Sequence, residues 1–316
     1  MHACALIILA LYSIVICIIF PKWTVDDAYI TFRYAENLAH HLQLSWNVGE
    51  APVEGYTGVV LPVVLALLMK IGVSPVAASH TIGLLSFAIT GVLIFHILVK
   101  LGVQASVSFL RFNIPIRHSI VVLFFTAPFL YTHAFSGLET LLFMACVTGT
   151  VYTLILYLES GKNNIVYIFL AVVLLTGLTR PEGFLLALIS FVAVGFIKSR
   201  YHRDHVHGFI GNVIMIYFLP LLVYGIWKWI YYGQLLPNAY YAKEYDGIIN
   251  KESLRALFLF FKSYLAGPVL SAIIFLLIYV SFLIKKYRER KYQITISHMV
   301  IFCISIVFIE IGRAHV

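Results

Sequence analysis

The chain has 316 residues, of which 61% are hydrophobic and only 11% are charged. This balance is too apolar for a soluble domain of this length and is typical of integral membrane proteins. The formal net charge of +8 does not indicate nucleic-acid binding, because the basic residues fall in short clusters between apolar runs, as membrane topology requires. We therefore expect a membrane protein with membrane lipid around it and no nucleic-acid partner.

The apolar runs predict membrane-spanning helices, each of which needs about 20 mostly apolar residues. Nine runs qualify, some of them short enough to be buried or tilted members of a bundle: residues 3–20, 76–99, 119–134, 138–157, 165–179, 183–197, 209–230, 265–284 and 294–309. A tenth run, residues 58–71, is shorter and contains Pro62, which favours a re-entrant or surface-lying helix. The expected fold is an all-α integral membrane protein with about nine transmembrane helices and amphipathic surface helices in the first extracytoplasmic loop.

The lysine and arginine clusters predict the orientation in the membrane. If residues 58–71 do not cross, the clusters near Lys100, Lys162, Lys198 and Lys285 all lie on the same side as the N-terminus. The positive-inside rule makes that side cytoplasmic. The first run also allows a signal peptide, although it lacks a basic leading region and a small-residue cleavage site. We expect a multi-pass protein of a bacterial inner or plasma membrane, with its N-terminus in the cytoplasm.

This orientation leaves the polar segments of the chain on the extracytoplasmic side. They are residues 21–57, 135–140, 179–182 and 231–255. The first of them contains an acidic pair, Asp26 and Asp27, at the start of a predicted amphipathic helix that lies on the membrane surface. Thr24 and Asp27 have the spacing of a capping box, and this leaves Asp26 as the less explained of the two. Capping, general-base catalysis and metal binding are all open for the pair.

The two faces of this predicted helix differ in polarity. Its apolar stripe consists of Ala28, Phe32, Ala35, Ala39 and Leu42, and its polar face carries Asp26, Arg33 and Asn37. Because Arg33 shares a face with Asp26, it is a candidate for holding a carboxylate ionised or for binding an anion.

Other ionisable residues lie at the predicted outer ends of the spans. Glu54 and Tyr56 follow a series of turn-forming residues, where a solvated loop charge and an interfacial aromatic residue are the simple alternatives. Glu139 lies in one outer turn, and Arg180 and Glu182 lie in another. Such residues usually face a cavity or a partner, so ligand binding and a plain salt bridge between the two turns are both open.

The last outer segment is rich in tyrosine. Residues 231–243 place four tyrosines around Pro237 and Asn238 and end at Lys243. Aromatic belts explain interfacial tyrosines without a ligand. Asn238, Tyr240 and Lys243 also suit a sugar or a phosphate group.

Taken in order, these motifs resemble the polyprenyl-phosphate-sugar-dependent membrane glycosyltransferases of the GT-C superfamily, most closely the branch of the terminal arabinofuranosyltransferases. The motifs that carry the resemblance occupy residues 26–35, 46–50, 53–57, 136–140, 178–183 and 231–243. Each motif is weak alone, but the ordered set is specific and covers about residues 23–243.

The resemblance implies an active site on the outer side, formed by the first outer loop and its surface helices. Asp26, with Asp27 beside it, would deprotonate the acceptor hydroxyl, and the lipid phosphate would leave as the acceptor oxygen attacks the anomeric carbon. The donor or acceptor would be bound by Arg33, Glu54, Tyr56, Glu139, Arg180, Glu182, Asn238, Tyr240 and Lys243. The implied partners are a polyprenyl-phosphate sugar donor and a glycan, lipid or protein acceptor. No cofactor is certain, and a divalent cation at the acidic pair is open.

Family members typically continue beyond the ninth span, often into a soluble domain. Residues 310–316 resemble a translated sequencing adapter and are excluded from the fold prediction. Residues 1–309 are therefore predicted to form one transmembrane domain that is incomplete at its C-terminus, and the activity of this fragment alone is open.

Two other functional classes compete with a glycosyltransferase. A transporter or a flippase for lipid-linked sugars would also carry intramembrane ionisable residues and a broken helix. A transporter with inverted repeats should show a second copy of the acidic-pair helix, and the sequence contains none. A structural membrane subunit would tolerate changes at Asp26, Glu139 and Arg180.

Overall fold

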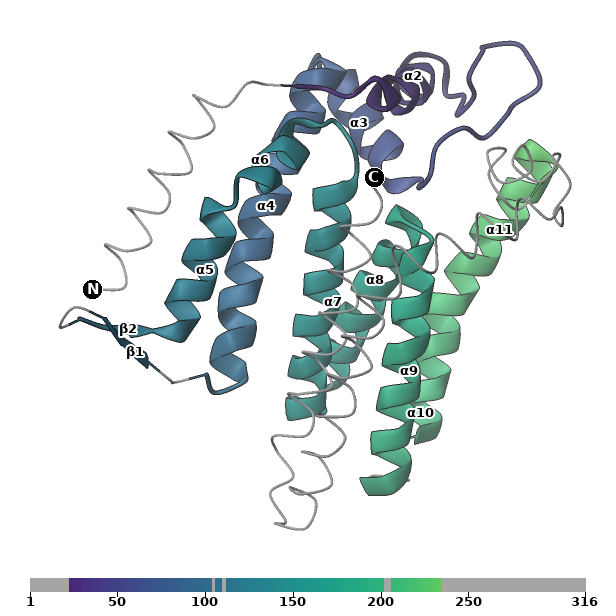
Figure 1. The fold of residues 1–316 in the computed structure, drawn as a ribbon. Helices are drawn as coiled ribbons and strands as arrows, with labels where there is room; N and C mark the ends of the chain where they lie inside the picture. Colours follow the sequence, from purple (N-terminus) through teal and green to yellow (C-terminus); the bar gives the residue numbers. More distant parts are fainter. Residues whose placement is uncertain (1–22, 104–105, 110–111, 202–205, 235–316) are drawn as a thin grey trace, which may run out of the picture. The chain divides into compact units, whose positions relative to one another are not determined.

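The computed structural model describes residues 23–103, 106–109, 112–201 and 206–234, which belong to one compact unit of the chain. This part of the chain is mostly helical (Figure 1). Its helices are α2 (Asp26–His41), α3 (Val60–Lys70), α4 (Pro75–Lys100), α5 (Ile116–Thr126), α6 (Pro128–Phe135), α7 (Thr140–Ser160), α8 (Asn163–Thr179), α9 (Glu182–Tyr201), α10 (Val206–Val213) and α11 (Leu219–Tyr232). A π-helical turn, Ile214–Phe218, joins α10 to α11.

A short antiparallel hairpin between α4 and α5 was not predicted from the sequence. It consists of β1 (Ser106–Phe109) and β2 (Phe112–Pro115), with Ser106 opposite Pro115 and Phe109 opposite Phe112. The all-α prediction is therefore correct for the bulk of the described residues but misses this hairpin.

Four helices within the described part are long and apolar enough to cross a membrane: Pro75–Lys100, Thr140–Ser160, Glu182–Ser199 and Val206–Tyr232. They coincide with four of the predicted spans, so apolar helices of membrane-spanning length are confirmed here. Three shorter apolar helices accompany them: Val60–Lys70, Ile116–Thr126 and Asn163–Thr179. The predicted spans at residues 3–20, 265–284 and 294–309 lie outside the described residues.

The predicted span over residues 119–134 is not one continuous helix. It is divided between α5 and α6 at Ala127, whose backbone is extended at φ −73° and ψ 110°. Pro128 follows as the first residue of α6. Proline lacks the N–H that would continue the α5 hydrogen-bond ladder, and it disfavours the helical conformation for the residue before it. Neither α5 nor α6 is long enough to cross a bilayer alone.

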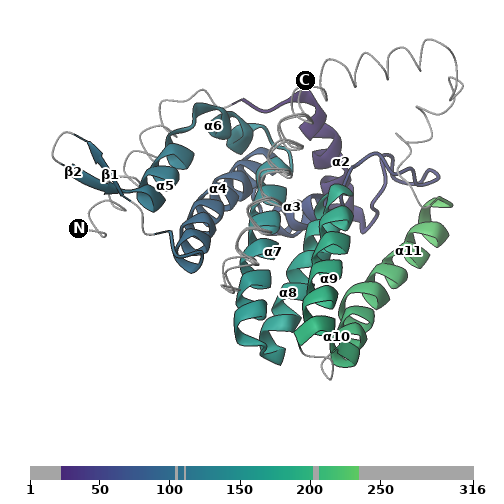
Figure 2. The same ribbon diagram turned by 60° about the horizontal axis from the view of Figure 1, so that its bottom comes forward.

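Helix α7 is the most enclosed of the long helices. It packs against α4 and α8, and α9 packs mainly against α8; Figure 2 shows these four helices side by side. The hydroxyls of Thr150 and Thr176 are 3.0 Å apart and join α7 to α8 in the interior. Gly149 admits close packing, because a Cβ there would lie 3.3 Å from Val172.

Because consecutive long helices run in opposite directions, their ends form two groups (Figure 1). At one end, which we call the α2 end, α4 and α7 begin and α6 and α8 finish; here Cys146 Sγ, near the start of α7, lies 4.0 Å from Thr179 Oγ1. At the opposite, basic end, Lys100 of α4 pairs with Glu159 of α7 at 2.8 Å. The segments predicted to be extracytoplasmic, as far as they are described, meet at the α2 end.

Helix α2 has the amphipathic character expected from its sequence. The stripe residues Ala28, Phe32, Ala35 and Ala39 are buried, at 0–8% exposure, and pack on Leu61 and Leu65 of α3 and Ala78 of α4. The inclusion of Leu42 in this stripe was wrong, because Leu42 takes a left-handed conformation at φ 56° that ends the helix. Its side chain is 74% exposed.

Helix α3 remains at the α2 end. It has 11 residues, or about 16 Å at ~1.5 Å per residue, which is about half the hydrocarbon thickness. Gly58, just before α3, packs directly against the carbonyl groups of Leu178 and Thr179 at the end of α8. This contact holds the start of α3 beside the α8–α9 turn and leaves no room for a side chain.

Replacing Gly58 with alanine should therefore destabilise the protein. A Cβ at this position would overlap the Thr179 carbonyl oxygen, and backbone atoms cannot move aside as a flexible side chain can. We expect a loss of ~1–3 kcal/mol in the unfolding free energy, the usual range for overpacking, measured by thermal unfolding in detergent. Gly225→Ala in α11 is the control, since a Cβ there meets nothing within 4 Å; an equal loss in both variants would contradict the assigned contact.

Candidate functional site

The acidic pair occupies the first turn of α2. Asp26 and Asp27 are both exposed, and no side chain in the described part of the chain forms a hydrogen bond or ion pair with either carboxylate. The capping-box interpretation was wrong: the helix is capped by Val25 without a side-chain hydrogen bond, and Thr24 Oγ1 lies 2.9 Å from His80 Nε2 instead. Both carboxylates gain from the positive end of the helix dipole while remaining open to solvent.

The start of α2 is fixed to the turn between α6 and α7. The Val25 N–H donates to the Ser136 carbonyl at 3.0 Å. Gly137 adopts φ +82°, a left-handed conformation that favours glycine, and a Cβ there would lie 2.7 Å from the Ala28 Cβ. The acidic pair is thus positioned next to the turn that carries Glu139.

The two ion-bearing turns meet at Arg180. Its Nε lies 3.5 Å from Glu139 Oε1 and 3.7 Å from Glu182 Oε2, and its side chain is 14% exposed. The guanidinium carbon lies 5.8 Å from the centre of the Phe143 ring. A salt bridge between the turns is therefore present. Both distances are long for hydrogen bonds, and Nε forms none within the described residues, so the guanidinium retains capacity for another anion.

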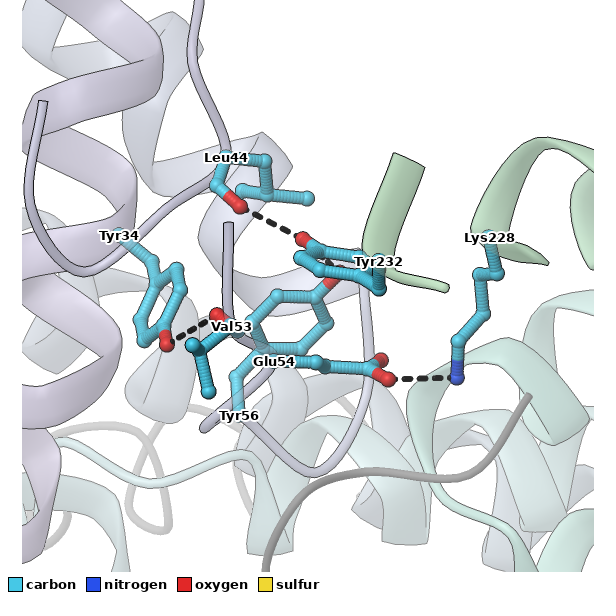
Figure 3. A network of polar contacts seen from close by, with 7 residues as sticks. All are labelled: Tyr34, Leu44, Val53, Glu54, Tyr56, Lys228 and Tyr232. Atoms are coloured by element: carbon cyan, nitrogen blue, oxygen red, sulfur yellow. Dashed lines mark hydrogen bonds and ion pairs between the residues drawn. The ribbon is translucent and has the colours of Figure 1, made fainter. Parts of the chain in front are cut away.

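The α2–α3 loop, residues 42–59, is attached to α11 by a buried ion pair. Glu54 Oε2 lies 2.7 Å from Lys228 Nζ (Figure 3), and the two residues are only 4% and 7% exposed. Burial raises the pKa of the Glu54 carboxyl, and the adjacent Lys228 opposes that rise. The simple interpretation of Glu54 as a solvated loop charge was therefore wrong. Lys228 was missed in the sequence, although a lysine inside an apolar run between Trp227 and Trp229 indicates a buried partner.

Tyrosines reinforce this attachment (Figure 3). The Tyr232 hydroxyl donates to the Leu44 carbonyl at 2.6 Å. It therefore accepts from the Tyr56 hydroxyl, 3.1 Å away. The Tyr34 hydroxyl donates to the Val53 carbonyl at 2.6 Å. Burial raises the pKa of Tyr34 and Tyr56, so both phenols stay neutral. The interpretation of Tyr56 as an interfacial aromatic residue was wrong. Its side chain is 3% exposed and links the loop to Tyr232.

Arg33 interacts with the same loop. Its Nε donates to the Trp46 carbonyl at 2.8 Å and its Nη2 to Asn47 Oδ1 at 3.1 Å. The guanidinium carbon lies 5.1 Å from the centre of the Trp46 ring. Within the described part of the chain, no ion pair joins Arg33 to Asp26, and the Arg33 guanidinium bonds to the loop instead.

Asn37 does not belong to the exposed face of α2. It is 8% exposed, and its amide donates to the carbonyls of Ser45 and Trp46 at 2.8 and 3.0 Å. The prediction that Asn37 lies on the exposed polar face of the helix was therefore wrong. Its role is to hold the start of the α2–α3 loop against the helix.

The remaining predictions for the site concern three residues of the last outer segment and a metal ion. Asn238, Tyr240 and Lys243 lie outside the described residues. No cluster of three or more His, Cys, Asp or Glu side chains that could hold a metal ion occurs among the residues the structure describes. A divalent cation at the acidic pair therefore stays a prediction.

The Glu54–Lys228 pair should contribute strongly to stability. Glu54→Gln leaves the Lys228 ammonium buried without a carboxylate, and we expect a loss of ~3–5 kcal/mol in the unfolding free energy. Lys228→Met should lower the unfolding free energy by a similar amount, because it leaves the Glu54 carboxylate buried without a cation. The double variant Glu54→Leu/Lys228→Met removes both charges and should be closer to wild type, as measured by chemical unfolding in detergent.

The Lys100–Glu159 pair at the basic end is the matched control, with side chains 39% and 45% exposed. Exposed pairs contribute little, so Glu159→Gln should leave stability nearly unchanged. Additive losses in the Glu54/Lys228 double variant would show that the two groups do not interact.

Comparisons of the chain with protein-family models, with curated proteins and with solved structures gave no match.

Proposed function

We propose that this chain is a membrane glycosyltransferase that moves a sugar from a polyprenyl-phosphate donor to an extracytoplasmic glycan, lipid or protein acceptor. The observation that supports the proposal is that the candidate site residues belong to one connected region of the structure. Contacts at the α2 end link the acidic pair to the Glu139 turn, the Glu139 turn to Arg180, and the α8–α9 turn to the α2–α3 loop. An exposed base and a poorly satisfied cation thereby belong to one connected region.

Asp26 is assigned as the general base. An acceptor hydroxyl needs a nearby group that takes its proton as its oxygen attacks, and the Asp26 carboxylate is exposed and has no competing partner among the described residues. The acceptor oxygen forms the new bond to the anomeric carbon, the bond from that carbon to the phosphate oxygen breaks, and the proton goes to Asp26. Asp27 stands beside it as the alternative base, or as a joint ligand for a divalent cation.

Arg180 is assigned to the donor phosphate. The phosphate gains negative charge as it leaves, and a guanidinium already positioned there stabilises that charge without reorganisation. Glu139 and Glu182 orient Arg180 through ion pairs. Lys243 is a further candidate for the phosphate, outside the described residues.

The long helices provide an environment for the lipid part of the donor. Large apolar side chains are exposed along α9 and α11, among them Leu188, Val192, Phe196, Leu222 and Ile226. In a bilayer such surfaces face acyl or polyprenyl chains. Following the positive-inside rule, we assign the basic end to the cytoplasm and the α2 end with its acidic pair to the extracytoplasmic side.

A transporter or flippase for lipid-linked sugars is the alternative that a specific observation favours. Glu54 and Lys228 form a buried ion pair between a loop and a long apolar helix, and such pairs mark substrate pathways in transporters. Under this alternative, a lipid-linked sugar would cross the membrane without its sugar–phosphate bond being broken. Release of polyprenyl phosphate separates the two functions.

Asp26→Asn should abolish transfer while leaving donor binding intact. A positioned base contributes about 100-fold or more to the rate, so kcat should fall at least that far. The purified chain would be supplied with polyprenyl-phosphate pentoses and hexoses and with acceptor, and release of polyprenyl phosphate would be followed. Glu36→Gln is the control, because Glu36 is an exposed carboxylate on the same helix with no assigned role. An Asp26→Asn enzyme with the wild-type rate would refute this base, and loss confined to Asp27→Asn would transfer the role to Asp27.

Arg180→Gln should weaken the donor side of the reaction. Loss of the guanidinium removes a charge-assisted contact to the phosphate, and we expect about a tenfold or larger drop in kcat/KM for the donor. Arg180→Lys should recover only part of it, because an ammonium lacks the planar fork. Lys162→Gln, an exposed cation at the basic end, should have no effect; equal losses in both would indicate a general charge effect.

A further inference from the structure

One exposed aromatic side chain at the α2 end is held in a fixed position. Trp46 is 42% exposed, yet its carbonyl accepts hydrogen bonds from Arg33 and Asn37. The Arg33 guanidinium stacks near one face of the indole, at 5.1 Å from its centre. Pre-organisation of this kind lowers the entropic cost of binding a ligand. A ring that served only as part of the core would be buried, and Trp46 is not.

The loop residues on either side of Trp46 carry polar groups. Asn47 accepts from Arg33 Nη2 at 3.1 Å and donates to Glu50 Oε2 at 2.8 Å. Gln43 Oε1 accepts from the Gly49 N–H at 3.3 Å. The amide, carboxylate and guanidinium groups are connected in an exposed network with donor and acceptor sites remaining. Such groups recognise hydroxyls, and a flat ring beside them suits a ligand with both apolar and hydroxylated faces.

The exposed face of α2 connects this platform to the acidic pair. Asp26, Tyr29 and Arg33 are spaced at i, i+3 and i+7, which places them on one side of a helix. Tyr29 is 54% exposed. Arg33 lies seven residues after Asp26, about 10 Å along the axis at ~1.5 Å per residue. A ligand on the Trp46 platform therefore needs to extend only past Tyr29 to reach Asp26.

We propose that the exposed face of α2 together with Trp46 is the acceptor subsite, and that the acceptor is a glycan. A sugar ring stacks on Trp46, its hydroxyls bond to Asn47 and Glu50, and the glycan runs past Tyr29 to present a hydroxyl to Asp26. The Asn47 amide and the Glu50 carboxylate next to Trp46 are exposed hydroxyl-recognising groups, which a glycan would satisfy and a lipid chain would not. The delivery of a hydroxyl to Asp26 rests on the proposed function, but binding on the platform does not.

The experiment uses the whole chain in lipid nanodiscs with short linear oligosaccharides of pentoses and of hexoses as probes. Binding is measured by saturation-transfer NMR, and the KM values for acceptor and for donor are measured separately. We expect Trp46→Ala to weaken oligosaccharide binding and to raise the acceptor KM about tenfold, with donor KM unchanged. Trp46→Phe retains a stacking ring and should keep most of the affinity, which separates loss of stacking from loss of fold.

Trp229→Ala is the matched control, since Trp229 is 62% exposed on α11 and has no assigned contact with the glycan. The inference is overturned if wild type binds no oligosaccharide, if Trp46→Ala binds as tightly as wild type, or if Trp229→Ala loses as much. The last result would make Trp46 an interfacial anchor. Oligosaccharide binding that depends on Trp46 would uphold the subsite whether or not transfer is observed, so its outcome is separate from that of the proposed function.

Discussion

A buried charge on an apolar helix determines where the α2–α3 loop must lie. Lys228 is 7% exposed within a helix of membrane-spanning length, and an ammonium in such a place requires an anion. Glu54 provides that anion from a loop more than 170 residues earlier in the chain. Once this pair forms, Tyr56 and Leu44 reach Tyr232. The loop therefore becomes a fixed part of the α2 end.

The loop in turn gives α2 a defined surface. Its polar contacts to Arg33 and Asn37 keep Trp46 beside the exposed face of the helix, while the buried face packs on α3. The first turn of α2 is held separately by the Ser136 carbonyl. The proposed chemistry needs both attachments: one places the base next to the Glu139 turn, which pairs with Arg180, and the other builds the surface along which an acceptor would approach.

Residue periodicity predicted much of this arrangement, and contacts between distant residues account for what it missed. The buried stripe of α2 and the four long apolar helices follow from local patterns of side-chain polarity. The division between α5 and α6 depends on a single proline, Pro128, whose effect was underestimated within an apolar run. The burial of Glu54 and Asn37 could not be predicted, because Lys228 and the carbonyls of residues 45 and 46 are brought to them only by tertiary folding. Thr24 illustrates the same point. Its position in the sequence suits a helix cap, but its hydroxyl contacts His80, which only tertiary folding brings close.

The central claim is that the acidic helix and the Arg180 turn face one aqueous compartment outside the cytoplasm. The most direct measurement is labelling of single cysteines, introduced at Asn47, Glu182 and Lys162 in a cysteine-free background, with a membrane-impermeant thiol reagent on intact cells. The account predicts that positions 47 and 182 react from outside and that position 162 reacts only after permeabilisation. Labelling of positions 47 and 182 from opposite sides of the membrane would contradict it.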